Sequence, residues 1–217
     1  MDVVVVGGHG KIGLRLLRLL AERGDRARGV IRKPEQAADL EAVGAEPVIA
    51  DVEQLDDLSP YVDGADAVVF AAGAGPGSGA ERKRAVDLGG AVKLIEAAEK
   101  AGIRRYLIVS SIGAHDPSSG GEQMRPYLEA KAGADQALIA SGLDYTIVRP
   151  GGLTDDPGSG LVELHTEFGH RGPIARDDVA AILLACLDLP ETTGLVFEAL
   201  GGDQPIEDAL RALTRSA

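Results

Sequence analysis

The chain has little of several residue types that mark common classes of protein. Its 217 residues include one cysteine, no tryptophan and only 3% aromatic residues. The single cysteine, Cys186, excludes an internal disulfide, and its place in the apolar run of residues 179–187 predicts a buried structural thiol. Few aromatic rings also mean few platforms on which nucleobases or sugars could stack.

Basic residues are also fewer than acidic ones. Lys and Arg number 22 against 34 Asp and Glu, which gives a net charge of −12. Nucleic-acid binding needs basic patches that release counterions, so we expect no such partner. No apolar run is long enough to span a bilayer, and the first residues do not resemble a signal peptide. We therefore expect a cytoplasmic protein with a small-molecule substrate and no membrane partner. A homodimer stays open, because no segment specifies the oligomeric state.

What is present is the pattern of an α/β domain. Short β-branched runs alternate with helical segments, without repeats or low-complexity tracts. We expect strands at residues 3–6, 26–31, 46–50, 67–70, 106–109, 145–148, 161–164 and 195–200. We expect helices at residues 11–23, from residue 34, and at residues 81–101, 127–140, 177–187 and 206–213.

This alternation implies right-handed crossovers between parallel strands. The predicted fold class is therefore α/β, a doubly wound parallel sheet (Rossmann fold) with a small C-terminal extension. The length suits one domain, residues 1–217. Within it, we expect residues 151–217 to complete the sheet and to add a small cap on the substrate side.

The strongest local signal is the glycine-rich segment VVVVGGHGKIG at residues 3–13. It fits the spacing G-x-G-x-x-G if read from Gly8, and G-x-x-G-x-x-G if read from Gly7. A predicted strand precedes it and an amphipathic helix follows, the context in which bare backbone and a helix N-terminus bind a pyrophosphate. The expected contacts come from Gly7, His9, Gly10, Lys11, Ile12 and Gly13. A glycine turn without a ligand is the alternative.

The end of the second predicted strand bears on the choice of dinucleotide. NAD-preferring sites place an acid there for the ribose hydroxyl, whereas a 2′-phosphate calls for arginine. This strand is followed by Arg32 and Lys33, and the first acid is Glu35. A guanidinium can form a forked contact with a phosphate. The sequence therefore predicts NADP(H) in preference to NAD(H), with a solvated surface pair as the alternative.

Further segments add to this pattern. They are Asp51-Val52, Ala71-Ala72-Gly73, Ser110-Ser111, Tyr127-x-x-x-Lys131 and the run LDYTIVRPG at residues 143–151. Together with the glycine loop and Arg32, they resemble the atypical short-chain dehydrogenase/reductase superfamily. The resemblance is to its NAD(P)H-binding, NmrA-like group, whose members are often labelled NAD-dependent epimerase/dehydratase. It spans nearly the whole chain and is specific for the superfamily, although not for a reaction.

The resemblance implies where the cofactor would lie. Asp51 would accept a hydrogen bond from the adenine amino group, and Val52 would contribute backbone contacts. The other implied cofactor residues are Ala71, Ala72, Gly73, Ser110, Lys131, Pro150, Gly151 and Gly152. For Asp51 the alternative is a plain turn or helix cap, and for the small residues after the fourth strand it is tight packing.

The resemblance also implies catalytic roles for Tyr127, Lys131 and Ser111. Tyr127 and Lys131 are four residues apart on a predicted helix, so their side chains share one face. In the superfamily the tyrosine gives or takes a proton at a carbonyl or alcohol while hydride moves to or from the nicotinamide. A free tyrosine has a pKa of about 10 and needs a nearby cation to act near neutrality, which Lys131 would supply. Ser111, or Ser110, would orient the substrate oxygen. A packed tyrosine beside a solvated lysine is the alternative.

Two departures from the superfamily pattern bear on function. Asp87 stands where dehydrogenases of the superfamily usually have asparagine, and little chain remains after Pro150 to build a nucleotide-sugar pocket. We expect an NADPH-dependent oxidoreductase acting on a small carbonyl, quinone or flavin-like acceptor. A non-catalytic NADP(H) sensor is the first alternative, and a sugar epimerase or dehydratase is the second. The four histidines show no metal-ligand spacing, so we expect no metal.

Overall fold

The computed structural model describes residues 1–75 and 77–216, apart from the side chain of Ser216. Its strands are β1 (Asp2–Val6), β2 (Arg26–Ile31), β3 (Glu46–Ile49), β4 (Ala67–Phe70), β5 (Arg105–Val109), β6 (Asp144–Pro150), β7 (Gly152–Thr154), β8 (Leu161–His165), β9 (Pro173–Ala175), β10 (Leu195–Gly201) and β11 (Gln204–Pro205). Its α-helices are α1 (Lys11–Arg23), α2 (Ala37–Ala42), α3 (Ser59–Val62), α4 (Ala80–Lys83), α5 (Ala91–Lys100), α6 (Gly121–Ala140), α7 (Arg176–Asp188) and α8 (Ile206–Ser216).

Nine of these strands form one sheet in the order β11-β8-β10-β6-β5-β4-β1-β2-β3. The pairs from β3 to β10 are parallel, and β8 runs antiparallel to both β10 and β11. The strand order reverses at β1, which pairs with β2 on one side and with β4 on the other. This confirms the doubly wound fold and places the ligand crevice beyond the carboxyl end of β1.

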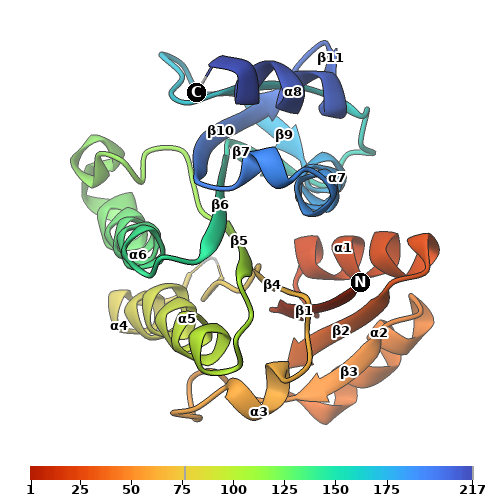
Figure 1. Ribbon diagram of the computed structural model, residues 1–217. Helices are drawn as coiled ribbons and strands as arrows, with labels where there is room; N and C mark the ends of the chain where they lie inside the picture. The colour runs from red at the N-terminus through yellow and green to blue at the C-terminus, as the bar shows by residue number, and fades with distance from the viewer. Residues whose placement is uncertain (76, 217) are drawn as a thin grey trace.

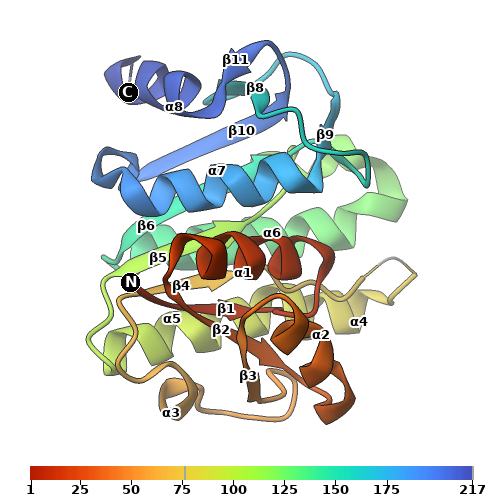
Figure 2. The ribbon, with the colours of Figure 1, turned by 90° about the vertical axis from the view of Figure 1, so that its right-hand side faces the viewer.

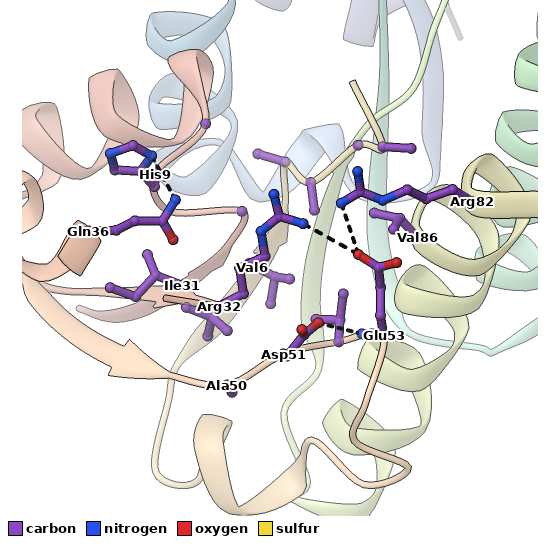
Figure 3. Close-up of a pocket in the computed structure, with 18 residues that line it drawn as sticks. Val6, His9, Ile31, Arg32, Gln36, Ala50, Asp51, Glu53, Arg82 and Val86 are labelled. Atoms are coloured by element: carbon purple, nitrogen blue, oxygen red, sulfur yellow. Dashed lines mark hydrogen bonds and ion pairs between the residues drawn. The ribbon is translucent and has the colours of Figure 1, made fainter. Parts of the chain in front are cut away.

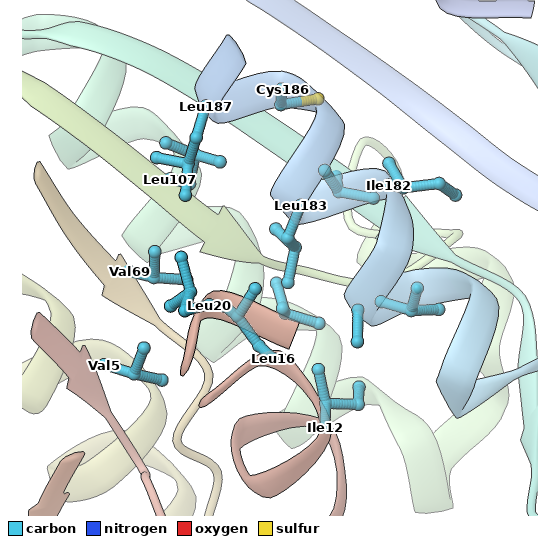
Figure 4. Close-up of a cluster of buried hydrophobic side chains, with 14 of the residues drawn as sticks. Val5, Ile12, Leu16, Leu20, Val69, Leu107, Ile182, Leu183, Cys186 and Leu187 are labelled. Carbon is cyan, nitrogen blue, oxygen red and sulfur yellow. The ribbon is translucent and has the colours of Figure 1, made fainter. Parts of the chain in front are cut away.

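Helices cover both faces of the sheet (Figure 1). On one face, α1 and α7 run side by side, as Figure 2 shows from the front. The buried leucines Leu16 and Leu20 of α1 and Leu183 of α7 pack there against Val5 of β1 (Figure 4). The opposite face is covered by α3, α5 and α6, whose apolar side chains pack against Val4 and its neighbours. Because both faces are buried, the strands are continuous apolar runs rather than alternating ones.

Two predicted helices differ from the observed ones. Helix α6 begins at Gly121, upstream of Tyr127, and contains Pro126 as its sixth residue, where the missing N–H leaves the helix without one i→i−4 hydrogen bond. The predicted helix at residues 81–101 is helical throughout, but its middle, Arg84–Gly90, is a π-helix between α4 and α5. Such π segments occur often at functional sites, and this one carries Asp87.

The structure confirms a buried position for Cys186 on α7. The short strands β7, β9 and β11, which the sequence pattern did not indicate, lie in the C-terminal part of the chain together with β8 and β10. Among residues 1–75 and 77–216, no helix combines the length and the apolar character that a membrane span requires.

Candidate functional site

The glycine loop joins β1 to α1 at the crevice. Gly7 has a φ of 88°, in the left-handed region that favours glycine, and its carbonyl accepts a hydrogen bond from the Gly10 amide at 2.8 Å. A Cβ on Gly13 would lie only 2.3 Å from the Gly7 oxygen, and a Cβ on Gly7 only 2.6 Å from the Ala72 nitrogen. Side chains are therefore excluded where the loop packs against β4 and α1, so the spacing that begins at Gly7 describes the turn. Gly8 instead packs closely on Gly29 of β2.

The start of α1 is suited to an anion. Gly10 is its N-cap, with no side chain to satisfy the first amides, and the first turn contains no acidic residue. Within this described segment the first amide groups and the positive end of the helix dipole therefore face the crevice unshielded. Lys11 turns away to pair with Asp155. This cradle fits the diphosphate of a dinucleotide.

A cleft of about 250 Å³ opens beside the loop. It is lined by the ends of β1, β2, β3 and β4 and by α4 and the π-helix (Figure 3). Of the predicted cofactor residues it brings together Gly7, His9, Gly10, Arg32, Asp51, Val52, Ala71, Ala72 and Gly73. Residues that the sequence interpretation did not assign also line it, among them Gln36, Glu53 and Arg82. We call it the adenosine cleft, because its lining includes Arg32 and Asp51, which the sequence assigns to the adenosine side of the cofactor, and that contact stays a prediction.

Polar side chains around this cleft bind one another. The His9 ring contacts Asp39 at 2.7 Å through Nε2 and Gln36 at 3.0 Å through Nδ1. Asp51 Oδ1 accepts a hydrogen bond from the Glu53 amide at 2.9 Å, so one oxygen of Asp51 shapes the turn after β3. For Asp51 the turn-cap alternative is thus part of its role, and the adenine contact stays a prediction.

Glu53 connects the two sides of the cleft. Its Oε1 lies 3.5 Å from Nη1 of Arg32, at the end of β2, and accepts a hydrogen bond at 3.1 Å from Nη2 of Arg82, on α4. The hydrogen bond from Arg82 to this carboxylate raises the pKa of Arg82 above its ordinary value. Figure 3 shows both guanidinium groups directed to the one carboxylate. The Arg32 side chain is also 45% exposed, so its contact with a 2′-phosphate stays a prediction and the solvated surface pair stays the alternative.

Beyond the Gly73 end of the cleft lies a buried charged cluster. Asp87 Oδ2 accepts a hydrogen bond from the Ala74 amide at 3.0 Å, and its Oδ1 lies 3.2 Å from Lys131 Nζ. Lys131 also donates to the carbonyl of Val109 at 3.0 Å, and its ammonium is 5.8 Å from the centre of the Tyr127 ring. The structure thus brings Tyr127 and Lys131 together at the carboxyl end of β5.

Lys131 is 3% exposed, which rules out the alternative of a solvated lysine. Burial alone would lower its pKa, but the neighbouring Tyr127, Asp87 and Asp135 outweigh burial and raise that pKa above its ordinary value. Lys131 is therefore a retained positive charge inside the protein, near the ring of Tyr127, the predicted catalytic tyrosine.

The two serines after β5 have different surroundings. Ser110 is buried and donates to Asp135 Oδ2 at 3.0 Å, an oxygen that also accepts from Arg149 at 2.9 Å. Ser111 is half-buried and donates to the Ile112 carbonyl at 3.2 Å. Only Ser111 is thus partly accessible, as the expected substrate-orienting role requires, and the side chain of Ser110 supports the fold. A cofactor contact through Ser110 stays a prediction.

The loop after β6 packs against the loop after β5. The carbonyl of Pro150 accepts from the Ile112 amide at 3.1 Å, and Gly152 donates to the Gly172 carbonyl at 2.9 Å. A Cβ on Gly151 would lie 2.2 Å from the Gly172 oxygen, so this position requires glycine. The loop therefore lies beside Ser111, and its contact with a nicotinamide ring stays a prediction.

Comparisons with known proteins agree with this geometry. The family model described as NAD(P)H-binding matches residues 7–190. A relative from Bacillus subtilis (strain 168), named an uncharacterized sugar epimerase (YhfK), is 44% identical over 98% of this chain and 100% of its own length. A Bacillus halodurans structure named as an NAD-dependent epimerase/dehydratase is 43% identical over 98% of this chain and 100% of that one, with a TM-score of 0.94.

A second solved structure, the anaerobillin reductase ChuY from Escherichia coli O157:H7, is more distant. It is 26% identical, covers 93% of this chain and 97% of that one, and has a TM-score of 0.80. The glycine cradle, the sheet topology and these matches lead to one assignment. The chain belongs to the NAD(P)H-binding family with a Rossmann fold, in agreement with its resemblance to the atypical, NmrA-like short-chain dehydrogenases/reductases.

Proposed function

We propose that the protein is an NADP(H)-dependent oxidoreductase that reduces a small carbonyl, quinone or flavin-like acceptor. The observation that carries the proposal is the buried Lys131 ammonium, 5.8 Å from the ring centre of the half-buried Tyr127. A permanent positive charge beside a phenol favours the phenolate that remains after the phenol has given up its proton. Tyr127 is thus suited to act as a general acid toward a reduced acceptor oxygen.

Each part of the proposed site has a separate role. The bare amides at Gly10 and the start of α1 bind the diphosphate, and the cleft between Arg32 and Asp51 takes the adenosine. When bound, the cofactor supplies or accepts a hydride. Tyr127 gives the proton, Lys131 holds positive charge beside it, and Ser111 orients the acceptor oxygen. Positioning and proton donation of this kind contribute about 10²- to 10⁴-fold to a rate.

The preference for NADP(H) is supported by charge. Arg32 and Arg82 both line the adenosine cleft, and a guanidinium binds a phosphate monoester through two parallel hydrogen bonds. NAD(H) has a ribose hydroxyl in place of that phosphate and would leave both cations without a new partner. We therefore expect tighter binding of NADPH than of NADH.

The C-terminal elements favour a small substrate over a nucleotide sugar. After β6, strands β8, β10 and β11 extend the sheet, while α7 and α8 pack against the apolar face shared with α1. These described elements build the domain itself, so they are not free to enclose a second nucleotide. The epimerase names of the relatives therefore describe the family more closely than they describe our expectation for this chain.

The test is the consumption of NADPH with a panel of small aldehydes, ketones, quinones and flavins. Tyr127→Phe removes the proton donor, so we expect kcat to fall by about 100-fold or more while NADPH binding stays within about twofold. Tyr145→Phe is the matched control. Tyr145 lies near the amino end of β6, whereas the candidate site lies at the carboxyl ends of the strands. Unchanged turnover in Tyr127→Phe would remove the tyrosine from the mechanism.

A second function, a non-catalytic NADP(H) sensor, is favoured by one observation. Asp87 shares the charge of Lys131 at 3.2 Å and so weakens its effect on Tyr127. A sensor must bind oxidised and reduced cofactor with different affinities, because a ligand shifts a conformation only through differential binding. Calorimetry with NADP⁺ and NADPH distinguishes the two. Unequal affinities without turnover on the panel support the sensor, and turnover supports the enzyme.

A further inference from the structure

The adenosine cleft contains a three-residue bridge that the sequence pattern did not indicate. Arg32 and Arg82 come from opposite sides of the cleft and meet at a single atom, Oε1 of Glu53, at 3.5 and 3.1 Å. All three residues line the cleft, and they are separated by 21 and 29 positions in the chain. Figure 3 shows the three side chains spanning the space above Asp51.

The charges of this bridge do not balance. Two guanidinium groups face one carboxylate, so the bridge itself keeps one unit of excess positive charge, part of which is compensated by the Asp51 carboxylate that also lines the cleft. A phosphate monoester offers three acceptor oxygens and a charge of about −1.5 to −2 at neutral pH, and it would match two arginines better. The guanidinium fork also fits phosphate geometry, because each arginine can donate two parallel hydrogen bonds.

The ion pairs that Glu53 makes with the two arginines are also weak enough for another anion to replace them. The Arg32 and Arg82 side chains are 45% and 41% exposed, and that of Glu53 is 25% exposed. Ion pairs at such accessible positions contribute little to stability, because water and salt screen them. An entering anion of higher charge therefore loses little by displacing Glu53.

We propose that Arg32, Glu53 and Arg82 form an exchangeable phosphate clamp, in which the ribose 2′-phosphate of NADP(H) replaces the Glu53 carboxylate between the two arginines. Arg82 is then a second specificity-determining residue, supplied from across the cleft. Glu53 is an internal competitor of the phosphate for the two guanidinium groups. This inference rests on the NADP(H) preference of the proposed function and adds the residues that set its strength.

The clamp makes opposite predictions for its two new members. Arg82→Ala removes one half of the phosphate site, so binding should weaken by about tenfold for a ligand that carries the 2′-phosphate. Glu53→Gln removes the competing negative charge and frees both arginines, so binding of the same ligand should tighten several-fold. A merely structural role for the bridge predicts loss of binding in both variants.

The experiment is calorimetric titration of the whole protein with 2′,5′-ADP, which carries the 2′-phosphate, and with 5′-AMP, which lacks it. We expect Arg82→Ala and Glu53→Gln to change the affinity for 2′,5′-ADP in opposite directions and to leave that for 5′-AMP unchanged. Arg84→Ala is the matched control, because it removes the same charge two residues further on, from an exposed side chain. It should leave both affinities within about twofold.

Each outcome separates the clamp from the proposal on which it rests. If the native protein binds NADH as tightly as NADPH, the NADP(H) preference itself is wrong. If that preference holds and disappears in Arg32→Ala, but Arg82→Ala behaves like Arg84→Ala, only the clamp is wrong. Weaker 2′,5′-ADP binding by Glu53→Gln would also overturn it, since an internal competitor cannot improve binding of its rival. Thermal unfolding of each variant without ligand shows whether it is folded.

Discussion

The carboxylate of Asp87 lies 3.2 Å from the ammonium of Lys131, and both side chains are almost completely buried. The pair joins the π-helix after β4 to α6 and stands between the adenosine cleft and Tyr127. A carboxylate in this position, rather than the amide usual in the superfamily, divides the attraction of Lys131 between two partners. The charge that Lys131 can present to Tyr127, the predicted proton donor, therefore depends on Asp87.

Asp87→Asn tests this relationship. The amide keeps an oxygen that can accept the Ala74 hydrogen bond but has no negative charge, so it removes one of the contributions that raise the pKa of Lys131. The positive charge of Lys131 then acts more fully on Tyr127, the predicted proton donor. We expect kcat for NADPH-dependent reduction to rise several-fold while the affinity for NADPH stays within about twofold. An unchanged kcat would show that the pair does not act on the proton transfer.

Gly13→Ala tests the diphosphate cradle. Its new Cβ would lie 2.3 Å from the Gly7 carbonyl, which is backbone and can move only if the whole loop moves. We expect a loss of about 1–3 kcal/mol in the free energy of unfolding and no increase in melting temperature with NADPH. Gly169→Ala is the control, because a Cβ at Gly169 meets no atom within 4 Å. Full thermal stabilisation of Gly13→Ala by NADPH would place the diphosphate elsewhere.

The fold could be predicted because its signals are local. The run Val3–Val6 is apolar on both faces, as a strand buried on both sides must be, and Gly7, Gly10 and Gly13 follow at a spacing that the turn requires. The predicted cofactor residues next to strand ends line one cleft for the same reason, since the carboxyl edge of a parallel sheet gathers such residues wherever the strands are correct.

The rest depends on contacts between distant segments. No pattern around Glu53 indicates that it meets Arg82, 29 residues further on, because that contact is set by how α4 lies over the turn after β3. The π-helix is equally hidden, since one extra residue per turn changes no composition and only shifts the face on which Asp87 lies. Ser110 and Ser111 are identical neighbours, and only the position of Asp135 on α6 tells them apart.

Cys186 supplies a probe of folding. Burial raises the pKa of its thiol to about 12, and the thiolate is the reactive form. At pH 8 only about one thiol in 10⁴ is ionised, so a disulfide reagent should not label the native protein and should label it at once in denaturant. The labelling rate under native conditions then reports opening of the core. Cys186→Ala gives the background, and rapid labelling without denaturant would contradict the buried position.

The last prediction concerns pH and the buried pair Asp135–Arg149. Burial raises the pKa of Asp135 above its ordinary value, against the opposing effects of Arg149, Ser110 and Lys131. Arg149→Met removes the hydrogen-bonded cation at 2.9 Å and so raises that pKa further.

A carboxyl whose pKa is higher in the folded than in the unfolded protein binds more protons when folded, so stability falls as the pH rises from the unfolded to the folded pKa. Arg149→Met should therefore approach native stability near pH 4 and lose about 3 kcal/mol by pH 8, as measured by urea unfolding. Adding Asp135→Asn removes the titrating group and should abolish this extra pH dependence. An equal loss at both pH values would mean that Arg149 contributes through packing alone and not through the charge of Asp135.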